Sequence, residues 1–107
     1  MSEAKEIIVV FSTVPRDKSA SLARMLIDLR LVACVNVVPV RSYYRWKGVF
    51  CDEEEDLLII KTAKEKTGEV IAAIKTDHPY ELPEIIALPV IDGHLPYLEW
   101  VHQETQG

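Results

Sequence analysis

The order of hydrophobic and polar positions at the start of the chain predicts a strand followed by a helix. Residues 7–11 form a continuous run of β-branched and aromatic residues, which is typical of a central strand buried on both faces. Between Pro15 and Arg30, apolar residues recur at helical spacing, with polar residues on the other side. This pattern predicts an amphipathic helix with a core-facing stripe of Leu22, Met25, Leu26 and Leu29.

The longest strand-like run lies in the middle of the chain. Residues 34–46 precede a turn at Lys47-Gly48, and an acidic run then leads into apolar residues 57–60. At about 3.3 Å per residue, the first arm of this hairpin spans roughly 43 Å, whereas a compact chain of this length is only about 34 Å across. One end of the ribbon should therefore project, and its unpaired backbone groups favour pairing with a second chain.

The turn also determines which residues face each other along the ribbon. It places Arg41 opposite Glu54, and it separates Cys34 from Cys51 by about ten residues, or roughly 33 Å. We therefore expect no disulfide within the chain, which agrees with a reducing compartment. Pro39 lacks the N–H that a strand ladder needs, so the first arm should bend or bulge there.

The second half of the chain predicts a helix, a strand and a second helix. Residues 62–65 match the capping box that opens a helix, and Pro79 ends that helix. Residues 85–91 form a last strand, in which Pro89 indicates an edge or a bulge, and a short helix follows from about Pro96. The resulting order is β-α-β-β-α-β plus a C-terminal helix, an α+β, ferredoxin-like fold with an antiparallel sheet.

Two helices can cover only one face of such a sheet. Val9, Phe11 and Ile59 belong to strands whose side chains alternate between faces, so these residues cannot all point toward the helices. The opposite face needs a cover, and we expect neighbouring subunits to supply it.

Composition limits the class of protein. The 107 residues allow one domain, which we take as 1–107. The formal net charge of −5 argues against a nucleic-acid partner, which would need a basic face. The N-terminal residues lack the apolar core of a signal peptide, and no run approaches the roughly 18 apolar residues of a membrane span. We therefore expect a cytoplasmic protein with no membrane partner.

Seven short motifs are spread over nearly the whole chain: STVP at 12–15, LVACVN at 31–36, YRWKG at 44–48, IKT at 60–62, HPYELPE at 78–84, ALPV at 87–90 and YLEW at 97–100. In this order and spacing they resemble the CutA family, the small divalent-cation tolerance proteins. The resemblance implies a ferredoxin-like subunit, related in architecture to PII signalling proteins and assembled as a homotrimer. It also implies a link to copper and other divalent metals, such as zinc, rather than a known enzymatic reaction.

The resemblance further implies where metal ligands would lie. Metal-binding members of the family use a cysteine in the motif after the first strand and a His-His pair before the Pro-Tyr. The matching positions here are Ser12, Asp77 and His78, of which His78 keeps a strong ligand for such metals. Cys34 adds a soft thiolate that suits Cu(I), and its alternative role is that of a small core residue.

Several of these candidates have a structural alternative. His78 would equally suit the C-terminus of a helix, where its charge favours the dipole. The acidic residues 52–56 attract hard cations, but alternation between faces favours a solvated ribbon edge over one chelate. Tyr43, Tyr44 and Trp46 favour packing at a subunit interface over stacking on a ligand.

Two rival functions stay open. Thr13 and Arg16, with Asn36, offer an anion-binding set for a phosphate-handling enzyme, although no Gly-rich loop lies near them. A PII-like sensor would instead bind a small molecule or anion between subunits and signal by moving the tip at residues 46–48. The sequence favours the metal-tolerance trimer and no enzymatic activity.

Overall fold

The computed structural model describes residues 6–106. In chain order, its elements are β1 (Ile7–Val14), α1 (Ser19–Asp28), β2 (Cys34–Trp46), β3 (Val49–Ala63), a 3-10 turn η1 (Lys64–Lys66), α2 (Thr67–Asp77), β4 (Ile86–Pro89) and α3 (Leu95–Glu104). The strands form one antiparallel sheet in the order β2-β3-β1-β4. The predicted β-α-β-β-α-β order with a C-terminal helix is therefore confirmed.

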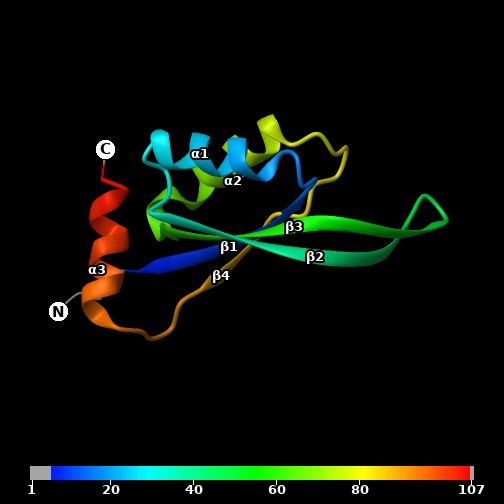
Figure 1. Ribbon diagram of the computed structural model, residues 1–107. Helices are drawn as coiled ribbons and strands as arrows, with labels where there is room; N and C mark the ends of the chain where they lie inside the picture. Colours follow the sequence, from blue (N-terminus) through cyan, green and yellow to red (C-terminus); the bar gives the residue numbers. More distant parts are fainter. Residues whose placement is uncertain (1–5, 107) are drawn as a thin grey trace.

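The helices α1 and α2 lie side by side on one face of the sheet, and α3 stands at one end (Figure 1). The core fills the layer between this face and the two helices. Alternate residues of β1 and β3 point into it, as the two-residue period of strands requires. The buried core cluster consists of Val10, Val14, Leu22, Leu26, Leu31, Val32, Leu58, Ile60, Val70 and Ile74.

The β2–β3 ribbon projects beyond the rest of the molecule, as the sequence predicted (Figure 1). Its pairing runs without interruption from Cys34 opposite Lys61 to Trp46 opposite Val49, whereas β1 reaches only as far as Asp56 of β3. The molecule accordingly measures 51 × 26 × 21 Å. Both turn residues, Lys47 and Gly48, have positive φ, which is the geometry of a tight two-residue hairpin.

Four local predictions need correction. The segment 62–65 does not cap a helix, because Thr62 still belongs to β3 and its hydroxyl donates to the Leu31 carbonyl at 2.6 Å. The first helix begins only at Ser19, and Leu29 lies just past its end with 58% of its surface exposed. The last strand is shorter than 85–91. Of the bend or bulge predicted at Pro39, the bulge is absent from the pairing, since β2 is an edge strand that needs no N–H on its outer side.

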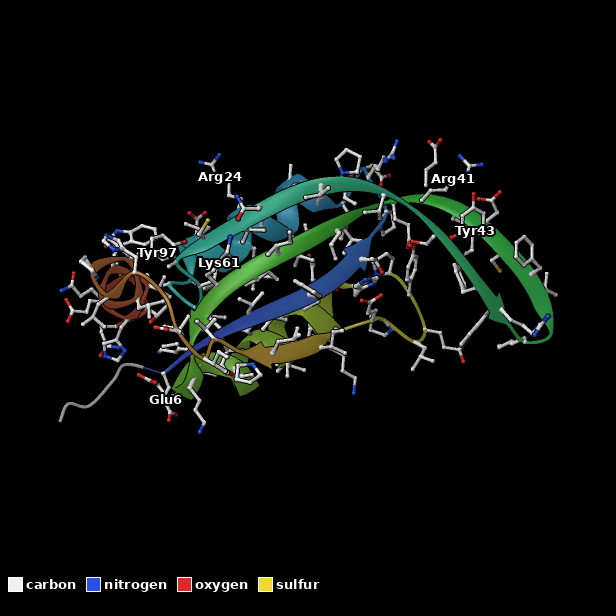
Figure 2. The ribbon with its side chains drawn as sticks, turned by 90° about the horizontal axis from the view of Figure 1, so that it is seen from below. Glu6, Arg24, Arg41, Tyr43, Lys61 and Tyr97 are labelled. Carbon is white, nitrogen blue, oxygen red and sulfur yellow. The ribbon has the colours of Figure 1, made fainter. Side chains whose placement is uncertain are left out.

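The sheet face away from α1 and α2 carries apolar side chains with nothing packed over most of them (Figure 2). We call it the open face. By register and alternation it includes Val9 and Phe11 of β1 and their neighbours on adjacent strands. Val38, Ile86 and Leu88 on this face are 39%, 50% and 41% exposed. A single chain thus leaves an extensive apolar surface in contact with water.

Candidate functional site

A hollow of about 680 Å³ lies where the projecting ribbon meets the segment that follows α2. Alternation along β2 and β3 directs Ser42, Tyr44 and Trp46 to the same face as Glu53 and Glu55. The segment after α2 closes the other side. The lining residues are Thr13, Ser42, Tyr43, Tyr44, Trp46, Glu53, Glu55, Pro79, Tyr80, Glu81, Leu82 and Glu84.

The lining of the hollow carries negative charge with no lysine or arginine. Glu55 is only 3% exposed, and its Oε2 accepts a hydrogen bond from the Tyr80 hydroxyl at 2.6 Å. The Tyr44 hydroxyl donates to Glu53 Oε1 at 2.8 Å, and Thr13 Oγ1 donates to Glu84 at 3.3 Å. Three carboxylates of the lining therefore accept hydrogen bonds from neutral hydroxyls, two of tyrosine and one of threonine.

The two tyrosines beside the carboxylates of the hollow have raised pKa values. The hydrogen bond to Glu53 raises the pKa of Tyr44 to about 12. Burial, and then the hydrogen bond to Glu55, raises the pKa of Tyr80 far above its usual value. In both cases a carboxylate beside the phenol disfavours a second negative charge. The hollow therefore suits a cation better than an anion.

His78 lies at the end of α2, where the sequence placed it, and its ring connects two parts of the fold. Its Nε2 is 2.8 Å from the Thr13 carbonyl, and its Nδ1 accepts from the Tyr80 N–H at 3.2 Å. Because a carbonyl can only accept, Nε2 carries the hydrogen of the neutral ring. The capping alternative needs correction, because the ring bonds to β1 rather than to the helix carbonyls. Neither ring nitrogen is free to bind a metal in this arrangement.

The other predicted ligands lie apart from a common site. Ser12 is fully buried on the helix-facing side of β1, and its hydroxyl has no partner among the described residues. Asp77 pairs with Lys18 at 3.6 Å, and Cys34 lies at the end of β2 that is far from the hollow, on the open face. Within residues 6–106, no group of three or more His, Cys, Asp or Glu is placed to hold a metal ion. The described part of one chain therefore does not bring three such ligands together.

The anion set weighed for an enzyme does not assemble either. Arg16 pairs with Glu54 at 3.2 Å and with Asp56 at 3.6 Å. Thr13 is bonded to Glu84, and the Asn36 side chain accepts from Lys61 on the open face. The geometry gives this alternative no support.

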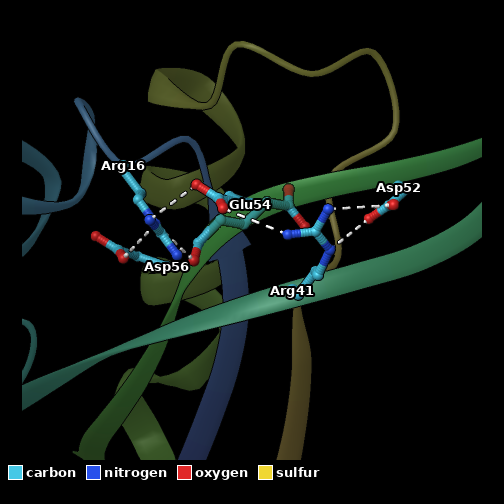
Figure 3. Close-up of polar contacts among 6 residues, drawn as sticks. Arg16, Arg41, Asp52, Glu54 and Asp56 are labelled. Carbon is cyan, nitrogen blue, oxygen red and sulfur yellow. Dashed lines mark hydrogen bonds and ion pairs between the residues drawn. The ribbon is translucent and has the colours of Figure 1, made fainter.

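The acidic run divides between the two faces of the ribbon. On the face opposite the hollow, Arg41 binds Asp52 at 2.8 Å and Glu54 at 3.4 Å, next to the Arg16 pairs (Figure 3). The predicted alternation is confirmed, but the prediction of a solvated edge is wrong for the last two residues of the run. Glu55 and Asp56 are 3% and 7% exposed. Asp56 is held by the Ser19 hydroxyl at 2.6 Å.

Replacing Tyr80 with phenylalanine should reduce the loss of stability at alkaline pH. The pKa of Tyr80 is raised in the folded protein, so the stabilisation from its neutral phenol is complete below the unfolded pKa near 10. It is lost as the pH rises from there through the folded pKa. We expect the unfolding free energy of the wild type to fall more steeply above pH 10 than that of Tyr80→Phe. Phenolate absorbance and urea unfolding measured across pH 9–12 would check this, and equal slopes would contradict it.

The chain is similar to known proteins over almost its full length. The profile of the family described as CutA1 divalent ion tolerance protein matches residues 8–104. A mouse (Mus musculus) protein named "Protein CutA" is 44% identical over 98 residues, which cover 90% of this chain and 55% of the mouse protein. The chain thus spans about half the length of this curated relative.

Solved structures share the fold. The crystal structure of CutA1 from Oryza sativa matches with a TM-score of 0.92 and 41% identity, covering 98% of each chain. The structure described as PII-like protein CutA from Nostoc sp. PCC 7120 in apo form matches with a TM-score of 0.90 and 34% identity, covering 92% of this chain and 97% of that one. The predicted α+β, PII-like architecture is confirmed.

No helix among residues 6–106 combines the length and the apolar character that crossing a membrane requires. The cytoplasmic location stays a prediction, because a rice relative is named as chloroplastic. With the family profile matched over residues 8–104 and the fold shared with solved relatives, the chain belongs to the CutA1 divalent ion tolerance protein family.

Proposed function

We propose that this protein acts as a homotrimer in the tolerance of, or the response to, divalent metal ions such as copper and zinc. The observation that carries the proposal is the family match over residues 8–104, because the family is described by tolerance of divalent ions. We further propose a cytoplasmic, non-catalytic role.

Two features of the subunit support an oligomer. The projecting part of β3 has no strand beside it where β1 has ended, and unpaired strand edges favour pairing with another chain. The open face exposes Val38, Ile86 and Leu88, and exposed apolar side chains gathered on one face favour contact with another chain. A ring of three copies would cover both features, and the likeness to PII-like structures is consistent with such an assembly.

We infer that any bound metal takes ligands from more than one copy. The predicted ligands Ser12, Cys34, Asp77 and His78 do not form one site within a chain. Asp77 and Cys34 are the accessible members of the set: the Asp77 side chain is 42% exposed, and Cys34 is a free, half-buried thiol. Carboxylate and thiolate ligands suit zinc and copper.

Metal titration of the untagged protein tests the metal role. We expect a trimer mass by light scattering at micromolar concentration and saturable Cu(II) or Zn(II) binding below millimolar metal by calorimetry. Cys34→Ala and Asp77→Asn should each weaken the affinity about tenfold or more, because each removes one ligand. Cys51→Ala, which removes the other free thiol, is the matched control and should leave binding unchanged. A trimer with no saturable metal binding would refute the metal role and leave the assembly intact.

A second function is favoured by the hollow. We propose that the trimer also senses a small molecule at the base of the projecting ribbon, in the manner of a PII-like protein. The tip is already connected to the wall of the hollow, because Lys47 pairs with Glu81 at 3.2 Å. A ligand that displaces this contact would move the 46–48 tip. An anion does not suit the four lining carboxylates.

A further inference from the structure

We propose that the hollow binds an organic cation with primary ammonium groups, of the class of linear diamines and polyamines. This inference rests on the second function proposed above, with the hollow left accessible between neighbouring copies although it lies on the open face. It names the class of molecule that would be sensed. It follows from three observations: the uncompensated charge of the lining residues, their aromatic rings, and the position of Lys47 beside them.

The first property is a buried negative charge that no cation offsets. Glu55 is 3% exposed, and among residues 6–106 it has a hydroxyl partner but no ion pair. The nearby Arg16 contacts Glu55 only at the backbone: its Nε donates to the Glu55 backbone carbonyl at 3.4 Å, and not to the Glu55 carboxylate. Glu53 and Glu84 also lack an ion pair in the described part of the chain. A buried carboxylate without a positive partner is costly, so a cationic ligand would gain the interaction that the protein does not supply.

The second property is the presence of aromatic faces beside these carboxylates. Trp46, Tyr44 and Tyr80 all line the hollow. An ammonium group is attracted to the face of an aromatic ring as well as to a carboxylate, and tryptophan is the best of the aromatic partners. Rings and carboxylates together are the recognition chemistry of an alkylammonium ion, whose methylene chain also packs on the rings.

The third property is that the protein already places an ammonium group against this lining. Lys47 Nζ lies 5.4 Å from the centroid of the Trp46 ring and 3.2 Å from Glu81 Oε1. Trp46 and Glu81 both line the hollow, and Lys47 itself does not. The Lys47 side chain is therefore an internal example of the ligand chemistry that we propose. An amine in the hollow would compete with it for Glu81.

Size and geometry favour an organic cation over a metal ion. The volume of about 680 Å³ lies within the range of roughly 300–1,000 Å³ that small-molecule sites occupy. The carboxylates do not converge, since no three of the described His, Cys, Asp or Glu residues are placed around one ion. Separate carboxylates match a molecule that carries several separated charges.

Calorimetry with spermidine and putrescine, on the untagged full chain at 150 mM salt, tests the proposal. We expect saturable spermidine binding in the micromolar range and weaker binding of putrescine, which carries fewer ammonium groups. The double variant Glu53→Gln/Glu84→Gln should weaken spermidine binding at least tenfold. Both residues are exposed enough that their replacement should leave the fold intact, which circular dichroism would check.

The matched control removes two charges from the same ribbon on its other face. Asp52→Asn/Glu54→Gln changes the net charge equally but replaces none of the lining residues, so its spermidine affinity should stay within about twofold of the wild type. An equal loss in both double variants would overturn the proposal, because it would indicate diffuse attraction to the acidic chain. Zinc binding without spermidine binding would overturn this inference and leave the metal function standing. Spermidine binding without a change in tryptophan fluorescence would support the site and remove the sensor role.

Discussion

Replacing Leu88 with aspartate should convert the proposed homotrimer into monomers at micromolar concentration. Leu88 is 41% exposed on the edge strand β4 and lies on the open face beside Val9. If a neighbouring copy covers this face, the new carboxylate would be buried without a partner in each contact. An uncompensated buried charge costs about 3–5 kcal/mol, which corresponds to a loss of association of more than a hundredfold. Light scattering coupled to gel filtration would measure the mass.

The control for this variant is an equally apolar residue on the other side of the molecule. Leu29 is 58% exposed just after α1, in the layer of helices that covers the opposite face. Leu29→Asp should keep the oligomer mass of the wild type, with both variants folded by circular dichroism. An oligomer that survives Leu88→Asp would show that the open face is not where copies meet. Dissociation of both variants would point to an effect of charge alone.

The hairpin was predictable because a two-residue turn leaves little freedom. Once Lys47 and Gly48 occupy the turn, each residue of β2 has a determined partner on β3, and the structure pairs Arg41 with Glu54 as expected. The excess length of the ribbon followed from the same reasoning. The face on which each side chain lies follows from alternation, which is a property of the strand itself.

The local capping motif failed because tertiary pairing outweighed it. Thr62 and Glu65 have the right spacing for a helix start, yet β3 continues to Ala63 because β1 pairs with it as far as Ile7. The Thr62 hydroxyl then finds a buried acceptor on Leu31. A motif of four residues contributes about 1 kcal/mol, which is less than the strand pairing and burial it competes with. A local stretch of sequence does not show this competition, because the pairing strand β1 lies far away in the chain.

Only one wall of the candidate site could be predicted from the sequence. Alternation along the ribbon would have placed Glu53 and Glu55 on one face with Tyr44, so the acidic run alone could have suggested a charged wall. Nothing in the sequence indicated that Tyr80 and the residues after it fold back against that wall. Their position depends on contacts between segments far apart in the chain. The burial of Glu55 was missed for that reason.

His78→Ala should lower the free energy of unfolding by about 2–4 kcal/mol. The ring is 8% exposed, and its loss leaves the Thr13 carbonyl and the Tyr80 N–H without their partners. It also removes the packing of the imidazole on the Tyr80 ring, whose centroid is 4.7 Å away. Urea unfolding of untagged protein would measure the change, at one fixed protein concentration because assembly adds to the apparent stability.

The matched control is His94, an exposed residue at the start of α3 whose side chain makes no capping hydrogen bond. His94→Ala should change the unfolding free energy by no more than about 0.5 kcal/mol. His78→Gln should recover part of the loss, since an amide can both donate to Thr13 and accept from Tyr80. This pattern would mark His78 as the anchor that holds the 78–85 segment over the hollow. A His78→Ala protein as stable as His94→Ala, but with tenfold weaker Cu(II) or Zn(II) binding, would instead make His78 the metal ligand that the family resemblance implied.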